Sequence, residues 1–167
     1  AVITNERQGW QDAIAELCGN GHRRIAVIGN VSGNFRKWTR EETLGLLQRY
    51  GAEPVMELTM SLPFERQPIM DWLHQVIPQY HPTAILCFSD FYAIHVYDVL
   101  KNMGLKIPDD VAVMGTCGYP NAAMLTPPLS TIDYRYEEIA AEAVRLLDQS
   151  ESPPTGSNCV RELPVVI

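Results

Sequence analysis

Polar and aromatic side chains gather at four places in this chain, each just after an apolar run. The four stretches are 30–38, 59–64, 89–90 and 116–119, and among them are Arg36, Trp38, Phe64 and Tyr119. Such a mixture holds sugars and other small polar ligands, because aromatic rings cover the apolar face of the ligand while fixed polar groups bond its hydroxyls. We expect a small-molecule site wherever the fold brings these stretches together.

The sequence lacks the motifs of enzymes with a doubly wound fold. It has no Gly-x-Gly-x-x-Gly loop, no Walker loop and no Gly-x-Ser-x-Gly elbow. The four cysteines lie far apart, and no spacing of cysteines or histidines matches a zinc site. We therefore expect a binding protein and not an enzyme, with no cofactor and no metal.

Composition restricts the partners. The formal net charge of −7 argues against nucleic-acid binding by this stretch alone, since the phosphate backbone favours clustered Lys and Arg. No apolar run approaches the ~20 residues of a membrane span, and no signal-peptide pattern is present. With the cysteines interpreted as reduced thiols, we expect a cytoplasmic location and no membrane contact. The chain starts without Met, already in strand-like character, which suggests a fragment of a longer protein.

One stretch indicates how the fold positions the site. Thr83 to Phe88 is a nearly unbroken apolar run, typical of a strand buried on both faces of a parallel sheet. It stops at Ser89 and Asp90, where a helical pattern begins at once and Asp90 occupies the expected N-cap position. In open α/β sheets, ligands bind where a strand ends in such a turn.

The same alternation of strand and helix runs along the whole chain. Further strands are predicted over 2–4, 25–29, 54–58, 111–114, 129–132 and 160–167, and helices over 8–19, 39–50, 69–77, 91–103 and 137–147. This order predicts an α/β fold with an open parallel sheet flanked by helices. Parallel strands all end at one edge, so the four polar stretches are expected to meet there.

Four ordered motifs resemble a known family. They are Gly21-His-Arg-Arg-Ile-Ala-Val-Ile28, Pro82-Thr-Ala with Ser89-Asp90 and Ala93, Gly104-Leu-Lys-Ile-Pro-Asp-Asp-Val-Ala-Val-Met-Gly115, and Thr126-Pro-Pro-Leu-Ser-Thr-Ile132. Together they resemble the effector-binding region of LacI/GalR-family transcription regulators, which have the periplasmic-binding-protein fold. The resemblance implies a small-molecule, sugar-like effector and a homodimer. It also implies operator binding through a headpiece absent from this chain.

The resemblance also implies a division of the chain. Residues 1–128 correspond to the C-terminal lobe with a crossover segment, and residues 129–167 return to the N-terminal lobe with a dimer-type helix and a final strand. A solute-binding protein for transport or chemotaxis shares this fold and is the alternative. The motif from Gly104 to Gly115, followed by Thr126-Pro-Pro-Leu, favours the regulator.

Ligand contacts follow from the resemblance residue by residue. The family's usual Asp near the first crossover falls on Asn5, and its pocket Arg falls on Glu42, a reversal of charge. The full set of implied contacts is Asn5, Arg36, Trp38, Glu42, Phe64, Ser89, Asp90, Cys117 and Tyr136.

Four of these residues also have a purely structural interpretation. Asp90 fits a helix N-cap, and Glu42 fits the capping-box partner of Thr39. Phe64 fits a ring packed under its helix, and Cys117 fits an inert thiol as well as a reactive one. The sequence leaves both interpretations open in each case.

Overall fold

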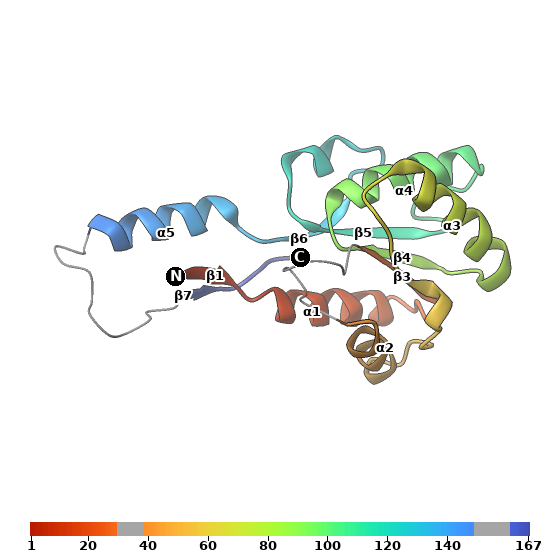
Figure 1. Ribbon diagram of the computed structural model, residues 1–167, viewed down its shortest axis with the longest axis horizontal. Helices are drawn as coiled ribbons and strands as arrows, with labels where there is room; N and C mark the ends of the chain where they lie inside the picture. The colour runs from red at the N-terminus through yellow and green to blue at the C-terminus, as the bar shows by residue number, and fades with distance from the viewer. Residues whose placement is uncertain (30–38, 149–160) are drawn as a thin grey trace.

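A five-stranded parallel sheet forms the main body of the protein (Figure 1). The computed structural model describes residues 1–29, 39–148 and 161–167. The strand order is β3-β2-β4-β5-β6. The strands are β2 (Ile25–Gly29), β3 (Thr59–Ser61), β4 (Ala84–Cys87), β5 (Ala112–Cys117) and β6 (Ser130–Asp133). This is the open parallel α/β sheet that the sequence predicts.

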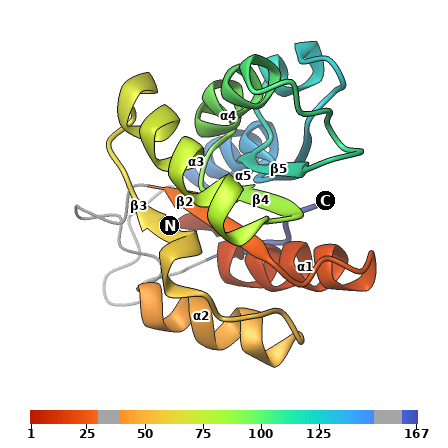
Figure 2. The same ribbon diagram turned by 90° about the vertical axis from the view of Figure 1, so that its right-hand side faces the viewer.

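Helices cover both faces of this sheet. The four helices are α1 (Glu6–Gly19), α2 (Arg40–Arg49), α3 (Arg66–Tyr80) and α4 (Asp90–Asn102). Figure 2 shows α3 and α4 on one side of the sheet and α1 and α2 on the other. Every residue of β2 and β4 is buried, because successive side chains of a strand point to opposite faces and both faces carry helices. Trp10 and Trp72 lie in the two cores, as predicted.

A smaller part of the chain lies beside the carboxyl ends of these strands. Strands β1 (Val2–Thr4) and β7 (Arg161–Leu163) form a separate two-stranded parallel sheet, and α5 (Tyr136–Asp148) contacts β1. The connections between the parts are tied together by backbone hydrogen bonds. Asp133 and Val166 form an antiparallel bridge, and the Asn5 amide donates to the Leu163 carbonyl at 2.9 Å.

The prediction of a strand over 54–58 is wrong, because this stretch forms a turn. Met56–Leu58 is a 3₁₀ helix, and β3 follows it within the predicted loop 59–63. The backbone amides of this stretch are used locally: Val55 donates to Glu53 and Leu58 donates to Val55. These two amides are therefore not available to a ladder with a neighbouring strand, which an apolar pattern alone does not reveal.

Several boundaries also differ from the prediction, among them the ends of α3 and β5. Helix α3 continues past Pro78 and ends at Tyr80, with His81 in the left-handed region at φ 49°. Strand β5 extends to Cys117 because Thr116 and Cys117 pair with Ile132 and Asp133 of β6. The division at residue 128 stays a prediction, and the chain leaves the main sheet only after β6.

Candidate functional site

The candidate site lies at the edge of the main sheet where its strands end. All five strands are parallel, so their carboxyl ends share one edge. Strand β6 leads from that edge towards α5, so the same edge faces the smaller part of the chain (Figure 1). Of the four polar stretches, residues 59–64, 89–90 and 116–119 follow or end strands here. Arg36 and Trp38 lie outside the described residues.

Four rings form a continuous row at this edge, and we call Phe64, Phe91, Tyr119 and Tyr136 the aromatic row. Neighbouring ring centroids are 5.7, 5.0 and 5.9 Å apart along the row. Phe64, Phe91 and Tyr136 are each nearly half exposed, with fractions of 49%, 44% and 45%. Half-exposed rings in one row offer apolar surface to a small ligand.

Phe91 was not among the predicted contacts. It follows the helical periodicity of α4 and so resembles a core residue in the sequence. Its position could have marked Phe91 as a site residue, because it lies in the first turn of a helix that begins directly after β4. A first-turn residue in such a place lies near the strand ends and thus near the site.

Asp90 is fully buried and is not the N-cap that the sequence predicts. The N-cap is Ser89, whose hydroxyl accepts from the Phe91 amide at 3.3 Å. The Asp90 carboxylate instead accepts from the Tyr119 amide at 2.8 Å and from the Thr131 hydroxyl at 2.6 Å. It therefore ties the start of α4 to the turn after β5 and to β6.

The backbone around Asp90 leaves no spare space. A Cβ at Gly115 would collide with a carboxylate oxygen of Asp90 and come within 2.8 Å of Leu129. Burial raises the pKa of Asp90, and the hydrogen bonds from Thr131 and Tyr119 oppose that shift. Asp90 thus has the environment of a structural anchor for the turn that carries Tyr119.

Cys117 lies at the end of β5 in an unusual backbone conformation, with φ 109°. Its side chain is buried, and the Thr116 hydroxyl lies 4.0 Å from its sulfur. Burial raises the pKa of the Cys117 thiol, and hydrogen bonds from Tyr136, Thr116 and Ser89 only partly oppose the shift. A thiol with a raised pKa stays protonated, which favours the inert interpretation of Cys117.

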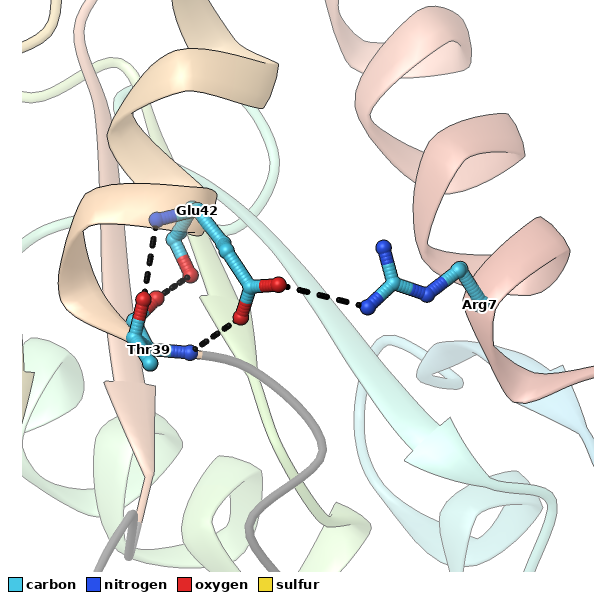
Figure 3. A network of polar contacts seen from close by, with 4 residues as sticks. Arg7, Thr39 and Glu42 are labelled. Carbon is cyan, nitrogen blue, oxygen red and sulfur yellow. Dashed lines mark hydrogen bonds and ion pairs between the residues drawn. The ribbon is translucent and has the colours of Figure 1, made fainter.

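Glu42 forms the predicted capping box and one further contact. Its carboxylate accepts from the Thr39 amide at 2.8 Å, and the Thr39 hydroxyl accepts from the Glu42 amide at 3.1 Å. The other carboxylate oxygen accepts from Arg7 at 3.3 Å (Figure 3). The Thr39 amide is the main cause of the lowered pKa of Glu42, and Arg7 adds to it. Sequence reasoning missed Arg7.

Asn5 and Tyr136 lie in the walls of one cavity of about 500 Å³. Arg7 belongs to the same walls, which are completed by Val2, Ile3, Thr4, Glu6, Ile139 and Glu162. The Asn5 side chain also caps α1 by accepting from the Gln8 amide at 2.9 Å. Arg7 therefore shares a cavity wall with Asn5 and bonds to Glu42. At the same edge, ring contacts of the aromatic row lead from Phe64 to Tyr136.

Within residues 1–29, 39–148 and 161–167, no three His, Cys, Asp or Glu side chains are placed to hold a metal ion. No helix in those ranges has the length and apolar character needed to cross a membrane.

Comparison with known proteins identifies the fold and its relatives. A model of the periplasmic binding protein-like domain family matches residues 14–167. The PurR transcriptional repressor of Vibrio parahaemolyticus is 30% identical over 151 residues, which cover 87% of this chain and 44% of that protein. The probable ExuR transcriptional repressor of Bacillus subtilis is 26% identical over 164 residues, covering 96% of this chain and 49% of that protein. The chain therefore spans about half the length of these curated relatives.

A solved structure shows the same fold. A LacI family transcriptional regulator from Enterococcus faecium with bound ribose matches 99% of this chain and 62% of its own, with a TM-score of 0.82. The two sequences are 21% identical, so this similarity concerns the arrangement of the chain.

Proposed function

The chain belongs to the periplasmic binding protein-like domain family, and from this premise we propose that it is the effector-sensing part of a DNA-binding transcription regulator. The observation that carries the proposal is the aromatic row at the strand ends, where α/β sheets bind ligands. The names of the curated relatives, which are transcriptional repressors, support the regulator over a transport protein.

The proposed ligand is a small, sugar-like molecule. The half-exposed rings of Phe64, Phe91 and Tyr136 offer apolar faces of the kind that stack on a sugar ring. The related regulator from Enterococcus faecium holds ribose, which supports this class. The proposed contacts remain those predicted from the sequence, with Phe91, Tyr119 and Arg7 added. We propose no catalytic step.

We propose that the working protein is a cytoplasmic homodimer that binds operator DNA through a separate headpiece. Residues 1–128 would form most of one lobe, and residues 129–167 would return to the other. Ala140, Val144 and Leu147 are exposed on α5 at helical spacing, which supports its role as a dimer helix. The ligand would change DNA affinity only if it binds the two lobe arrangements unequally.

The proposal is tested on the full-length protein in two steps. A thermal-shift screen against neutral sugars, nucleosides and sugar phosphates identifies a ligand, because a ligand that binds the folded state raises its melting temperature. Operator binding is then measured with and without that ligand. We expect a ligand-dependent change in DNA affinity. A ligand that stabilises a protein with no DNA affinity at all would favour the solute-binding alternative.

A further inference from the structure

Arg7 and Glu42 form an ion pair between the first turns of α1 and α2 (Figure 3). An Arg7 guanidinium nitrogen lies 3.3 Å from a Glu42 carboxylate oxygen. Both side chains are open to water, with exposed fractions of 60% and 44%. An exposed pair of this kind contributes little to the stability of the fold. Its effect on the charge that a ligand meets is therefore the more important property.

Glu42 is held in position by contacts other than the one with Arg7. One carboxylate oxygen accepts from the Thr39 amide at 2.8 Å, while the other contacts Arg7. The Glu42 amide is fixed in turn on the Thr39 hydroxyl at 3.1 Å. Glu42 is therefore a positioned carboxylate that does not need Arg7 to stay in place.

Arg7 is the one cationic side chain among the described residues that line the cavity of about 500 Å³. The same walls carry two carboxylates, from Glu6 and Glu162, together with Asn5 and Tyr136. An anionic ligand in this cavity would have to use Arg7, since a guanidinium is the usual partner of a carboxylate or phosphate group. One nitrogen of that guanidinium already donates a hydrogen bond to Glu42.

We infer that Glu42 is a built-in counter-ion of Arg7 that makes the cavity select neutral ligands over anionic ones. The carboxylate cancels the charge of Arg7 and takes one of its donors, and so repels carboxylated or phosphorylated sugars while tolerating uncharged ones. Discrimination of this kind arises from a repulsive element as much as from attractive contacts. Arg7 and Glu42 are thus specificity-determining residues, an inference that rests on the proposed small-molecule site.

The test uses inorganic phosphate as the probe and the full-length protein. Glu42→Gln removes the negative charge while an amide oxygen still accepts from the Thr39 amide, so α2 keeps its cap. The matched control is the double variant Arg7→Gln with Glu42→Gln, which also lacks the guanidinium. Phosphate binding is followed by NMR titration at constant ionic strength, with chloride as the balancing anion.

We expect Glu42→Gln to bind phosphate about fivefold more tightly than the natural protein, the effect of removing one like charge near the anion in a water-exposed site. The gain should vanish in the double variant. Equal phosphate affinity in the natural protein and Glu42→Gln would overturn the inference, as would a gain that survives in the double variant.

Neutral and phosphorylated sugars separate this inference from the proposed function. We expect Glu42→Gln to raise the affinity for glucose 6-phosphate relative to that for glucose, because only the phosphorylated sugar carries the charge that Glu42 repels. If no neutral sugar or nucleoside binds any form, the proposed function fails, and the phosphate titration still decides the role of Glu42.

Discussion

The Thr131 hydroxyl donates a 2.6 Å hydrogen bond to the fully buried carboxylate of Asp90 and so connects β6 to the start of α4. The same carboxylate accepts from the Tyr119 amide at 2.8 Å. Tyr119 stands between Phe91 and Tyr136 in the aromatic row. The anchor formed by Asp90 therefore fixes the backbone that carries the middle of the candidate site.

Replacing Asp90 should destabilise the fold strongly. Asp90→Ala leaves two part-buried donors, the Tyr119 amide and the Thr131 hydroxyl, without their acceptor, at an expected cost of about 2–4 kcal/mol. Urea unfolding of the full-length protein measures the change. The matched control is Asp109→Ala at an exposed position, which should change stability by less than about 0.5 kcal/mol. Equal effects of the two substitutions would contradict the anchoring role.

The close approach of Gly115 to Asp90 gives a second prediction. Gly115→Ala places a methyl group against the Asp90 carboxylate and Leu129, and overpacking of this kind costs about 1–3 kcal/mol. Gly45→Ala is the control, because nothing lies within 4 Å of its new methyl group inside α2. We expect this control to gain about 0.5–1 kcal/mol from helix propensity. A neutral Gly115→Ala in the same denaturation series would refute the packing described for Asp90.

Removing the hydroxyl should change the stability of the fold differently at two tyrosines of α4. The Tyr92 hydroxyl donates to the Leu62 carbonyl at 2.8 Å, so Tyr92→Phe should cost about 1 kcal/mol. The buried Tyr97 hydroxyl has no hydrogen-bond partner among the described residues, so Tyr97→Phe should be neutral or stabilising. Thermal unfolding of the two variants provides the comparison, and a larger loss in Tyr97→Phe would show that its hydroxyl is satisfied.

Alkaline pH should weaken the fold partly through Tyr97. Burial raises the pKa of Tyr97 to about 12 from an ordinary value of 10. Between these values the folded chain keeps a proton that the unfolded chain has lost, so stability falls as the pH rises from 10 to 12. The natural protein should lose more stability over this range than Tyr97→Phe. Parallel pH profiles of the two proteins would contradict the raised pKa.

Local signals explain what the sequence predicted well. The apolar run from Thr83 to Phe88 contains β4, and the spacing of Thr39 and Glu42 gives a capping box that the structure contains. Both features depend on neighbours within a few residues. Such patterns are visible without knowing how the chain folds.

Contacts between distant residues explain what the sequence did not predict. Asp90 bonds to residues 29 and 41 positions away, so its short-range signal as an N-cap was misleading. Arg7 meets Glu42 across 35 residues, and no local pattern marks it as part of a site. The shift from a predicted strand over 54–58 to β3 has the same origin, because pairing with β2 decides which residues form the strand.

The aromatic row predicts a loss of ligand affinity without a loss of fold. Phe64→Ala removes a ring that is 49% exposed, so we expect at most about 1 kcal/mol of destabilisation. Affinity for a ligand found by the thermal-shift screen should fall about tenfold, as expected when an aromatic contact is truncated. The control is Met124→Ala, which removes a side chain that is 82% exposed and lies outside the row. Calorimetric titration that shows equal affinities for both variants would remove Phe64 from the site.

Hydrogen–deuterium exchange of the full-length protein with and without such a ligand tests most directly whether the strand ends form the effector site. We predict protection at residues 4–7, 61–64, 89–91, 117–119 and 133–136, which carry the aromatic row and the cavity that contains Asn5 and Arg7. Protection confined to the opposite edge of the sheet, at residues 19–24 and 103–111, would contradict it.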